Sequence, residues 1–485
     1  MSKNIKKTII FAVILVVLVL LMIILKVTDN TDDKKDVTTT AAAVSERLVD
    51  YSGYDVSVTD ILSIDVKNAE SEYTVLYNDG SCVIADMNYD FNSSVIDTIP
   101  SNALTATIIN KPTGTSGYGF EDPQAEYTIN FTDNRSMTVI IGNVSPVASE
   151  TYVKLGENIF TISTYLTKPY LQNETYYLSP VVYPAFEKEE DKAIDSVEIS
   201  IHGAEYSVKI SKRTDLHSQK AFSPYQYILT YPAVVSLNKT KADTYITSIF
   251  GLTADRVVGI ENKSAGYNPY RQNEYLCTVL YRNPDISFDI YKAPEDSDLD
   301  YYLIQNHSNL VYGFSAETIV DNEGNTEPKL PWLAIEPTDI ISSYTITELS
   351  VWAYKSLVVE TADKTYNFEC NASEDKETFT VELDGATYDR DRFQKFNAFL
   401  LDGYINYGDF NPAKGERLAK ITITMGYGEV YTVEYFEDTE NPLNVVSYVN
   451  GSAFGALSVD YINSLFKNLE LLNTEETFVS RKSGV

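Results

Sequence analysis

The chain has 485 residues and a formal net charge of −31, from 69 acidic and 38 basic side chains. A chain of this length is too long for a single hydrophobic core, and about three globular units are expected. The negative charge excludes nucleic acid as a partner, because too few cations are present to neutralise a run of phosphates.

The chain holds 37 tyrosines but only three histidines and three cysteines. Tyrosine suits half-buried pleated surfaces, so its abundance favours a strand-rich fold. The cysteines form no metal-binding or disulfide pattern, and we expect them to be buried thiols. They are Cys82, Cys277 and Cys370.

The first 26 residues predict a membrane anchor. Eighteen uncharged residues, Thr8–Leu25, follow Lys3, Lys6 and Lys7. A helix of this length can cross a bilayer, and the positive-inside rule keeps its basic end cytoplasmic. We therefore expect a single-pass protein of the cell membrane with an extracytoplasmic C-terminal part. A cleaved signal peptide is the alternative, because Ala41–Ala43 could serve as a cleavage site, although it lies far beyond the apolar run.

Beyond the anchor, one sequence design occurs three times. Each copy opens with an isoleucine and alternating apolar residues, followed by a polar turn and a second alternating run. This pattern predicts a β-hairpin in each copy. The three hairpins are expected at Ile61–Tyr77, Ile194–Ile210 and Ile346–Phe368.

A helix is expected after each hairpin. In the second copy either Asn238 or Thr240 can cap it, and in the first copy Pro100 should end or kink it. The apolar residues at helical spacing are Ala242, Tyr245, Ile246 and Ile249 in the second copy and Tyr388, Phe393, Phe396, Phe399 and Leu400 in the third.

Each copy then continues with a further block of alternating strands. In the first block Tyr127, Ile129 and Phe131 face one way with polar residues between them, which predicts a strand with one solvent-exposed face. Met137, Val139 and Ile141 repeat the pattern in the first block, and Ile421, Ile423 and Met425 repeat it in the third block. After the third block, Ser458 can cap a closing helix that carries Ile462, Leu465, Phe466 and Leu469.

Hairpins, helices and further hairpins in succession predict an α+β fold with antiparallel sheets in three tandem repeats. Two connecting segments rich in proline and charged residues, Ser179–Ala193 and Asp321–Asp339, separate the repeats. The expected organisation is therefore a cytoplasmic tip and transmembrane helix (1–26), a flexible stalk (27–48), and three repeats (49–178, 179–337 and 338–485).

The most specific motif of the sequence lies just before the predicted strand that carries Tyr127, Ile129 and Phe131. Tyr118, Gly119, Asp122 and Pro123 form a YGFEDP turn, and Gly142 follows an isoleucine on the next strand. Proline presets φ for a turn, and glycine permits the bend. We interpret these five residues as a structural turn motif.

With these residues and the later Tyr152, Val153 and Leu155, the chain resembles the bacterial domain-of-unknown-function 4340 family. Phe120 replaces the leucine that is usual in the motif. The close resemblance covers about one hundred residues of the first repeat, while the second and third repeats lack the Asp-Pro pair. The resemblance implies a membrane-anchored extracytoplasmic protein, often encoded beside ABC transporters, and it implies no catalytic residues.

Three patterns are weighed as candidate sites. Glu121 and Asp122 are adjacent and should point apart, so they do not suit the facing carboxylates of a glycosidase. The acidic loops Glu295–Asp300 and Asp321–Glu327 could bind calcium but lack the full EF-hand spacing. A sugar-stacking platform would need Trp332 and Trp352 with Tyr176–Tyr177 and Tyr301–Tyr302.

His202, His217 and His307 have no ligand spacing, and we predict no catalytic residue, metal or cofactor. The expected function is that of a non-enzymatic, membrane-anchored accessory subunit that docks a protein partner in an ABC-transporter or envelope complex. The alternatives are a cell-wall-binding or carbohydrate-binding surface protein and, from a different class, an envelope hydrolase.

Overall fold

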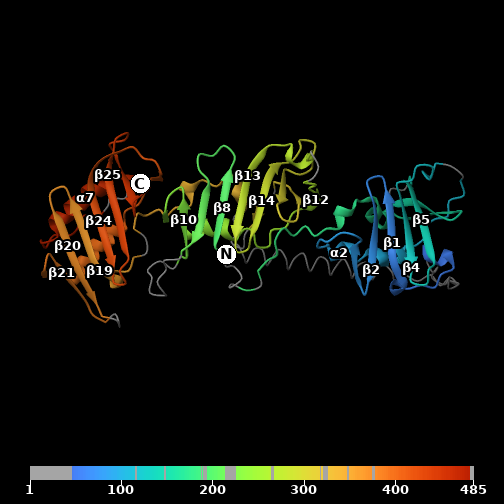
Figure 1. Ribbon diagram of the computed structural model, residues 1–485, viewed down its shortest axis with the longest axis horizontal. Helices are drawn as coiled ribbons and strands as arrows, with labels where there is room; N and C mark the ends of the chain where they lie inside the picture. Colours follow the sequence, from blue (N-terminus) through green and yellow to red (C-terminus); the bar gives the residue numbers. More distant parts are fainter. Residues whose placement is uncertain are drawn as a thin grey trace, which may run out of the picture. The chain divides into compact units, whose positions relative to one another are not determined.

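The computed structural model describes residues 46–480, apart from 115–116, 147–148, 187, 189–193, 214–224, 264–266, 317, 321–325, 347–348 and 374–376. Three large antiparallel sheets, of seven, nine and nine strands, dominate this part of the chain (Figure 1). The residues form two compact units. One contains residues up to 69 together with 100–171, and the other contains 70–99 together with 172 onward.

The first sheet has the strand order β3-β2-β1-β4-β5-β6-β7. In its central hairpin Tyr127 lies opposite Val139 and Ile129 opposite Met137, all of them buried. The predicted hairpins and the one-sided burial are thus confirmed here. Its strands are β1 (Ile61–Asn68), β2 (Glu72–Asn78), β3 (Ser81–Ile84), β4 (Ala125–Phe131), β5 (Ser136–Val144), β6 (Glu150–Leu155) and β7 (Asn158–Ser163).

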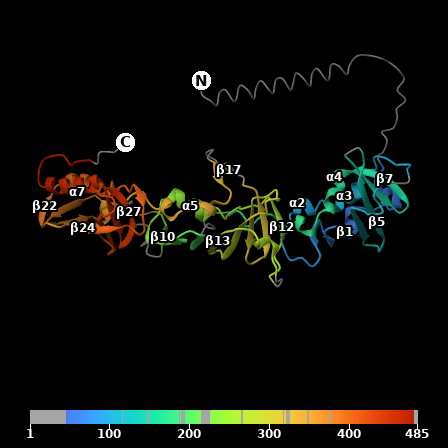
Figure 2. The same ribbon diagram turned by 90° about the horizontal axis from the view of Figure 1, so that it is seen from above.

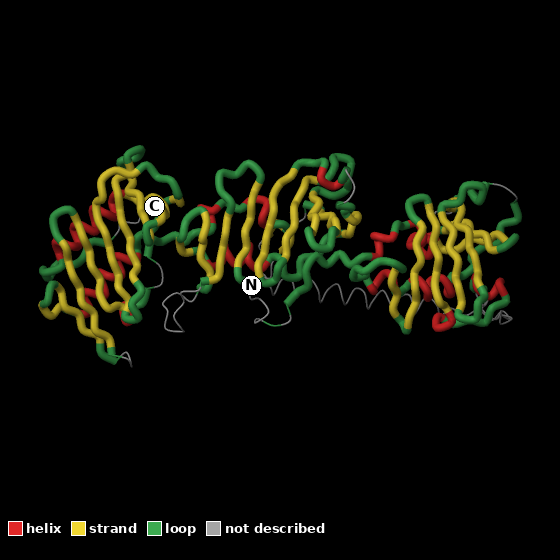
Figure 3. The backbone as a smooth tube through the Cα atoms, in the orientation of Figure 1, coloured by secondary structure: helices red, strands yellow, loops and turns green. Residues whose placement is uncertain are grey.

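The second sheet has the order β11-β10-β9-β8-β13-β14-β15-β16-β12. Figure 3 shows its strands side by side. They are β8 (Ser196–Ile201), β9 (Val208–Lys212), β10 (Tyr227–Tyr231), β11 (Val235–Ser236), β12 (Arg256–Ile260), β13 (Tyr275–Arg282), β14 (Ile286–Lys292), β15 (Tyr301–Gln305) and β16 (Leu310–Phe314). A small separate ribbon pairs β17 (Thr318–Val320) with β18 (Thr326–Pro328).

The third sheet has the order β22-β21-β20-β19-β24-β25-β26-β27-β23, which matches the second sheet strand for strand. Its strands are β19 (Tyr354–Thr361), β20 (Thr365–Ala372), β21 (Phe379–Leu383), β22 (Ala386–Tyr388), β23 (Tyr407–Gly408), β24 (Lys414–Met425), β25 (Val430–Asp438), β26 (Asn444–Val449) and β27 (Ser452–Ser458).

The first sheet follows the same plan with one strand fewer at each end. An isolated bridge pairs Asn110 with Thr161 beside β7, at the position that β12 and β23 occupy in the other two sheets. The prediction of strand-rich tandem repeats of antiparallel sheet is therefore confirmed.

Three longer helices carry most of the apolar residues that the sequence predicted at helical spacing, but Ile249 lies beyond the end of its helix and Tyr388 lies on strand β22. The helices are α5 (Lys239–Thr247), α6 (Arg390–Leu401) and α7 (Val459–Leu471), and α7 lies along one side of the third sheet (Figure 2). Asn238, not Thr240, caps α5 by accepting a hydrogen bond from the Lys241 amide at 3.2 Å. Ser458 caps α7 as expected, by accepting from the backbone amide of Asp460.

The prediction that Pro100 ends or kinks a helix is wrong. A short helix, α2 (Ser93–Ile96), comes first, and α3 (Ile99–Thr105) begins one residue before Pro100. Proline is tolerated in the first helical turn, because the amide that it lacks has no partner there. Pro100 therefore lies at the start of a helix. The remaining short helix is α4 (Thr164–Thr167).

The expected start of the third hairpin is also wrong. Ile346 is buried, but the strand begins only at Tyr354, after a short 3₁₀ helix over Val351–Ala353. Ile346 packs into the hydrophobic core from a connecting segment. Burial alone does not distinguish a buried connection from a buried strand, which explains the error.

The second segment rich in proline and charge, Asp321–Asp339, is not an open linker where the structure describes it. Leu330, Trp332 and Ile335 are buried in a hydrophobic cluster that extends from Leu178 to Leu472. Further along, residues 340–342 pair with residues 236–238 through hydrogen bonds from the Asn238 amide to the Ile340 carbonyl and from the Ser342 amide to the Ser236 carbonyl, both 2.8 Å. The second and third repeats therefore share one core.

The predicted anchor at Thr8–Leu25 and nearly all of the predicted stalk lie outside the described residues. Among the residues that the structure does describe, no helix is both long and apolar enough to span a membrane. The repeat boundaries at residues 178 and 337 stay predictions.

Candidate functional site

The motif that carries the family resemblance forms a loop that leads into β4. This motif loop, residues 117–124, lies against the bulged end of β5. The Tyr118 carbonyl accepts a hydrogen bond from the Asn143 amide at 2.7 Å, and the Gln124 amide donates to the Ile141 carbonyl at 2.9 Å. The structure therefore brings the turn residues and the Ile-Gly pair together as packing partners.

Two glycines are required by this packing. Gly119 has φ +82°, and a Cβ there would come within 2.5 Å of Asn143 Oδ1. A Cβ on Gly142 would collide with the Tyr118 carbonyl oxygen and lie 2.9 Å from Phe120 Cε1. The Tyr118 ring in turn lies 4.7 Å from the ring of Tyr152, centroid to centroid.

The carboxylates of the motif play no part in this contact surface. Glu121 and Asp122 are exposed, and Pro123 follows them in the bend before β4. The motif loop is thus held by backbone hydrogen bonds, glycines and aromatic rings. The geometry fits a structural turn, and it offers no pair of facing carboxylates.

A second loop covers the outer face of the second sheet. In this cover loop, residues 267–274, Arg271 forms a two-pronged ion pair with Glu261 and donates to Asp289 Oδ2 at 2.7 Å and to the Tyr291 hydroxyl at 3.0 Å. The Asn268 side-chain amide also donates to Glu261. The Glu261 side chain is only 3% exposed, whereas that of Arg271 is 26% exposed.

These hydrogen bonds, most of all those with Glu261, raise the pKa of Arg271, so the guanidinium stays charged. Beneath the cover loop, Tyr291, Ile304 and Val311 form a small second core on the face of the sheet opposite the main core. The network is closed on itself, and its chemistry is structural: it fixes the cover loop on the sheet.

The sequence prediction missed this network, although a signal was available. Asn268–Pro269 precedes β13 as Asp122–Pro123 precedes β4, and Asn411–Pro412 precedes β24. Asn268 accepts a hydrogen bond from the Tyr270 amide at 2.9 Å, as an aspartate in this position could. The second repeat therefore forms a side-chain-capped turn at its Asn-Pro pair, whereas in the third repeat Asp409 accepts a hydrogen bond from the Asn411 amide at 2.9 Å.

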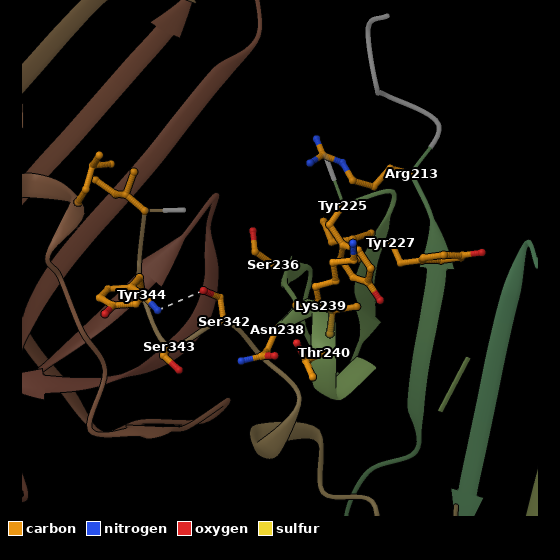
Figure 4. A pocket seen from close by; sticks show the side chains of 14 residues that line it. Arg213, Tyr225, Tyr227, Ser236, Asn238, Lys239, Thr240, Ser342, Ser343 and Tyr344 are labelled. Atoms are coloured by element: carbon orange, nitrogen blue, oxygen red, sulfur yellow. Dashed lines mark hydrogen bonds between the residues drawn. The ribbon is translucent and has the colours of Figure 1, made fainter. Parts of the chain in front are cut away.

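A pocket of about 410 Å³ lies where the second and third repeats join. Figure 4 shows Arg213, Tyr225 and Lys239 on one side of this junction pocket, Ser342 and Tyr344 on the other, and Ser236 between them. The residues that line it come from β10, the start of α5, the connecting residues 342–346 and the end of α6. Its volume falls within the range of small-molecule sites.

The polar groups of the junction pocket are positive or neutral. Arg213 and Lys239 line it, and its lining contains no aspartate or glutamate from the part of the chain that the structure describes. Arg213 is paired at its outer side with Glu429, 3.6 Å away. Burial, reinforced by the Asp243 carboxylate, raises the pKa of Tyr225, so its phenol stays protonated and donates to Asp243 Oδ1 at 3.1 Å.

The acidic loop at Glu295–Asp300 uses its carboxylates within the protein. Asp298 forms an ion pair with Arg256, and Asp300 Oδ2 accepts a hydrogen bond from the Ala316 amide at 2.6 Å. Most of the second acidic loop lies outside the described residues. Across the described ranges, no group of three or more histidine, cysteine, aspartate or glutamate side chains is arranged to hold a metal ion.

The aromatic residues weighed as a sugar platform are not brought together. Trp332 is fully buried and donates to the Tyr281 hydroxyl at 3.1 Å, and Tyr177 is buried as well. Trp352 is half-buried against Phe379, with ring centroids 5.4 Å apart. Tyr301 and Tyr302 lie on β15. His202 and His307 are exposed, and His217 lies outside the described residues.

The three cysteines are buried and free, as the sequence predicted. Burial raises the pKa of each thiol to about 12. At pH 8 only about one thiol in ten thousand is then ionised, and the thiolate is the reactive form. We therefore expect no reaction of the native protein with Ellman's reagent within minutes at pH 8, and three reactive thiols after unfolding in guanidinium. Rapid reaction of one thiol in the folded protein would contradict this reading.

Three copies of one antiparallel sheet plan, each with a loop that contains an Asx-Pro pair before a central strand, define a tandem strand-rich α+β protein. Residues 83–274 match the model of a family described as Domain of unknown function (DUF4340), which confirms the expected family over this part of the chain. The match reaches beyond the first repeat and includes both the motif loop and the cover loop. No curated protein and no solved structure matches the chain.

Proposed function

We propose that this protein is a non-enzymatic, membrane-anchored extracytoplasmic subunit that docks a protein partner in a transporter or envelope complex. The observation that supports the proposal is the use of one sheet plan three times, with the motif and cover loops held by structural contacts. Repeated units of this kind offer several surfaces for protein contact.

The anchor is the first part of this proposal to test. The full chain should sediment with membranes and resist extraction at high pH, whereas a variant without residues 1–26 should be recovered in the soluble fraction, because it lacks the apolar segment at Thr8–Leu25. A tag at the C-terminus of the full chain should be cleaved by protease added to intact spheroplasts. Protection of that tag, or a soluble full chain, would contradict the predicted topology.

The partner is tested by site-specific crosslinking in the native membrane. Tyr165, Tyr267 and Leu443 are 72%, 67% and 71% exposed, so a photocrosslinking amino acid at each can reach a neighbouring protein without disturbing a core. At least one position should yield a crosslink to a transporter permease, identified by mass spectrometry. The same substitution at the fully buried Trp332 is not a suitable control because it would unfold the core. The matched control is therefore each variant without illumination.

The alternative functions predict different results in the same cells. A cell-wall-binding protein would be retained on isolated walls and would yield no permease crosslink. An envelope hydrolase would release products from peptidoglycan or glycans when the purified full chain is added.

A further inference from the structure

The junction pocket differs in charge from the rest of the chain. The protein carries 69 acidic and 38 basic side chains, yet the described residues that line this pocket include two cations and no carboxylate. At physiological ionic strength, charges farther away than about 8 Å are largely screened, so the lining residues dominate the local potential. The pocket is therefore suited to an anionic group.

The nearest acidic groups are already engaged. Glu429 pairs with Arg213 from outside the pocket, and Asp243 accepts the Tyr225 hydroxyl. Lys239 makes no ion pair with any residue that the structure describes, and its side chain is exposed at the pocket wall. Lys239 is thus the cation with a charge available to a ligand.

Several hydroxyl groups line the pocket together with this cation. Ser342 is buried, and its Oγ accepts a hydrogen bond from the Tyr344 amide at 3.1 Å, so its own O–H can donate elsewhere (Figure 4). The hydroxyls of Ser236, Thr240 and Ser343 also line the pocket. A set of hydroxyls that can both donate and accept suits a ligand that carries several hydroxyls of its own.

The walls supply flat aromatic surface. Tyr225 and Tyr227 are buried on the side of the second repeat, and Tyr344 is 41% exposed on the side of the third. Aromatic rings can pack against the apolar face of a sugar ring while their hydroxyls remain in polar contact. This combination disfavours a purely apolar ligand, and the lack of carboxylates among the described lining residues disfavours a divalent cation.

We propose that the junction pocket binds a small hydroxylated carboxylic acid of the sugar-acid class, with its carboxylate at Lys239 and its hydroxyls toward the serine side of the pocket. Because the lining residues come from two repeats, the ligand would contact both of them. This binding function is separate from partner docking and can hold whether or not a permease is the partner.

Isothermal titration of the purified full chain in detergent tests the proposal. The probes are D-glucuronate, D-glucose and inorganic phosphate at equal ionic strength. We expect glucuronate to bind at least about tenfold more tightly than glucose, which lacks the carboxylate, and than phosphate, which lacks the hydroxylated ring, because each lacks hydrogen bonds of the predicted set. Absence of glucuronate binding, or binding of glucose or of phosphate as tight as that of glucuronate, would overturn it.

Two matched variants locate the site. Lys239→Gln removes the pocket cation and should weaken glucuronate binding about tenfold. Lys241→Gln makes the same charge change two residues later on the same helix, at a side chain that does not line the pocket, and should leave binding unchanged. Both lysines are exposed, so neither change should affect folding, which an unchanged melting temperature would verify. Equal weakening by both variants would show general charge attraction and would rule out this pocket.

Discussion

Replacement of Glu261 by glutamine should lower the free energy of unfolding by about 3 kcal/mol. The substitution keeps the shape of the side chain but removes the carboxylate that receives Arg271 and Asn268. An amide there brings a donor toward the guanidinium, and the buried position of residue 261 denies the new amide compensating water. We expect the cover loop to detach, with faster hydrogen exchange in peptides from residues 256–291.

The matched control for this change is Asp298→Asn. It also converts a carboxylate to an amide in the second repeat, but its ion pair with Arg256 is exposed on both sides, at 69% and 47%. Exposed pairs contribute about 0–1 kcal/mol, so stability should scarcely change. Urea titrations of both variants give the free energies of unfolding. Similar losses of stability in the two variants would show that the Glu261 network contributes no more than an exposed ion pair.

Replacement of Gly142 by alanine should cost about 2–3 kcal/mol in the first repeat. The added Cβ would collide with the backbone carbonyl of Tyr118, which cannot turn aside because it accepts the Asn143 amide. The motif loop must then lift off β5, and its aromatic contact with Tyr152 should weaken. Thermal unfolding and exchange of peptides from residues 117–144 measure the effect.

Gly426→Ala serves as the comparison for Gly142. A Cβ at Gly426 would meet its nearest neighbour, the Ala353 carbonyl, only at 3.6 Å, which is ordinary contact. We expect a change within about 0.5 kcal/mol. If Gly142→Ala proves equally mild, the family motif is held by something other than this close approach.

The repeats were predictable from the sequence because period-two alternation and polar turns repeat in the same order in each copy. Phe393 and Phe396 on α6, and Leu465 and Leu469 on α7, fell at helical spacing and are buried as predicted. Pro100 and Ile346 misled for one common reason. Both residue types are compatible with more than one element, and only the tertiary surroundings decide which one forms.

The candidate site was less predictable. The YGFEDP residues identified the motif loop, but the close approach of Tyr118 to Gly142 depends on where two strands meet. The Glu261–Arg271–Asp289 network joins residues from β12, the cover loop and β14 that are separated in sequence. The junction pocket depends on the pairing of residues 340–342 with 236–238, which no local pattern encodes.

That pairing gives the repeated design an unexpected property. The border between the last two repeats in the sequence is not a border of the hydrophobic core. Trp332 and its apolar neighbours belong to a core that extends into the next repeat. If the protein were divided at the apparent border between the last two repeats, each fragment would expose apolar residues of the shared core. Neither of the last two repeats is therefore expected to be stable without the other.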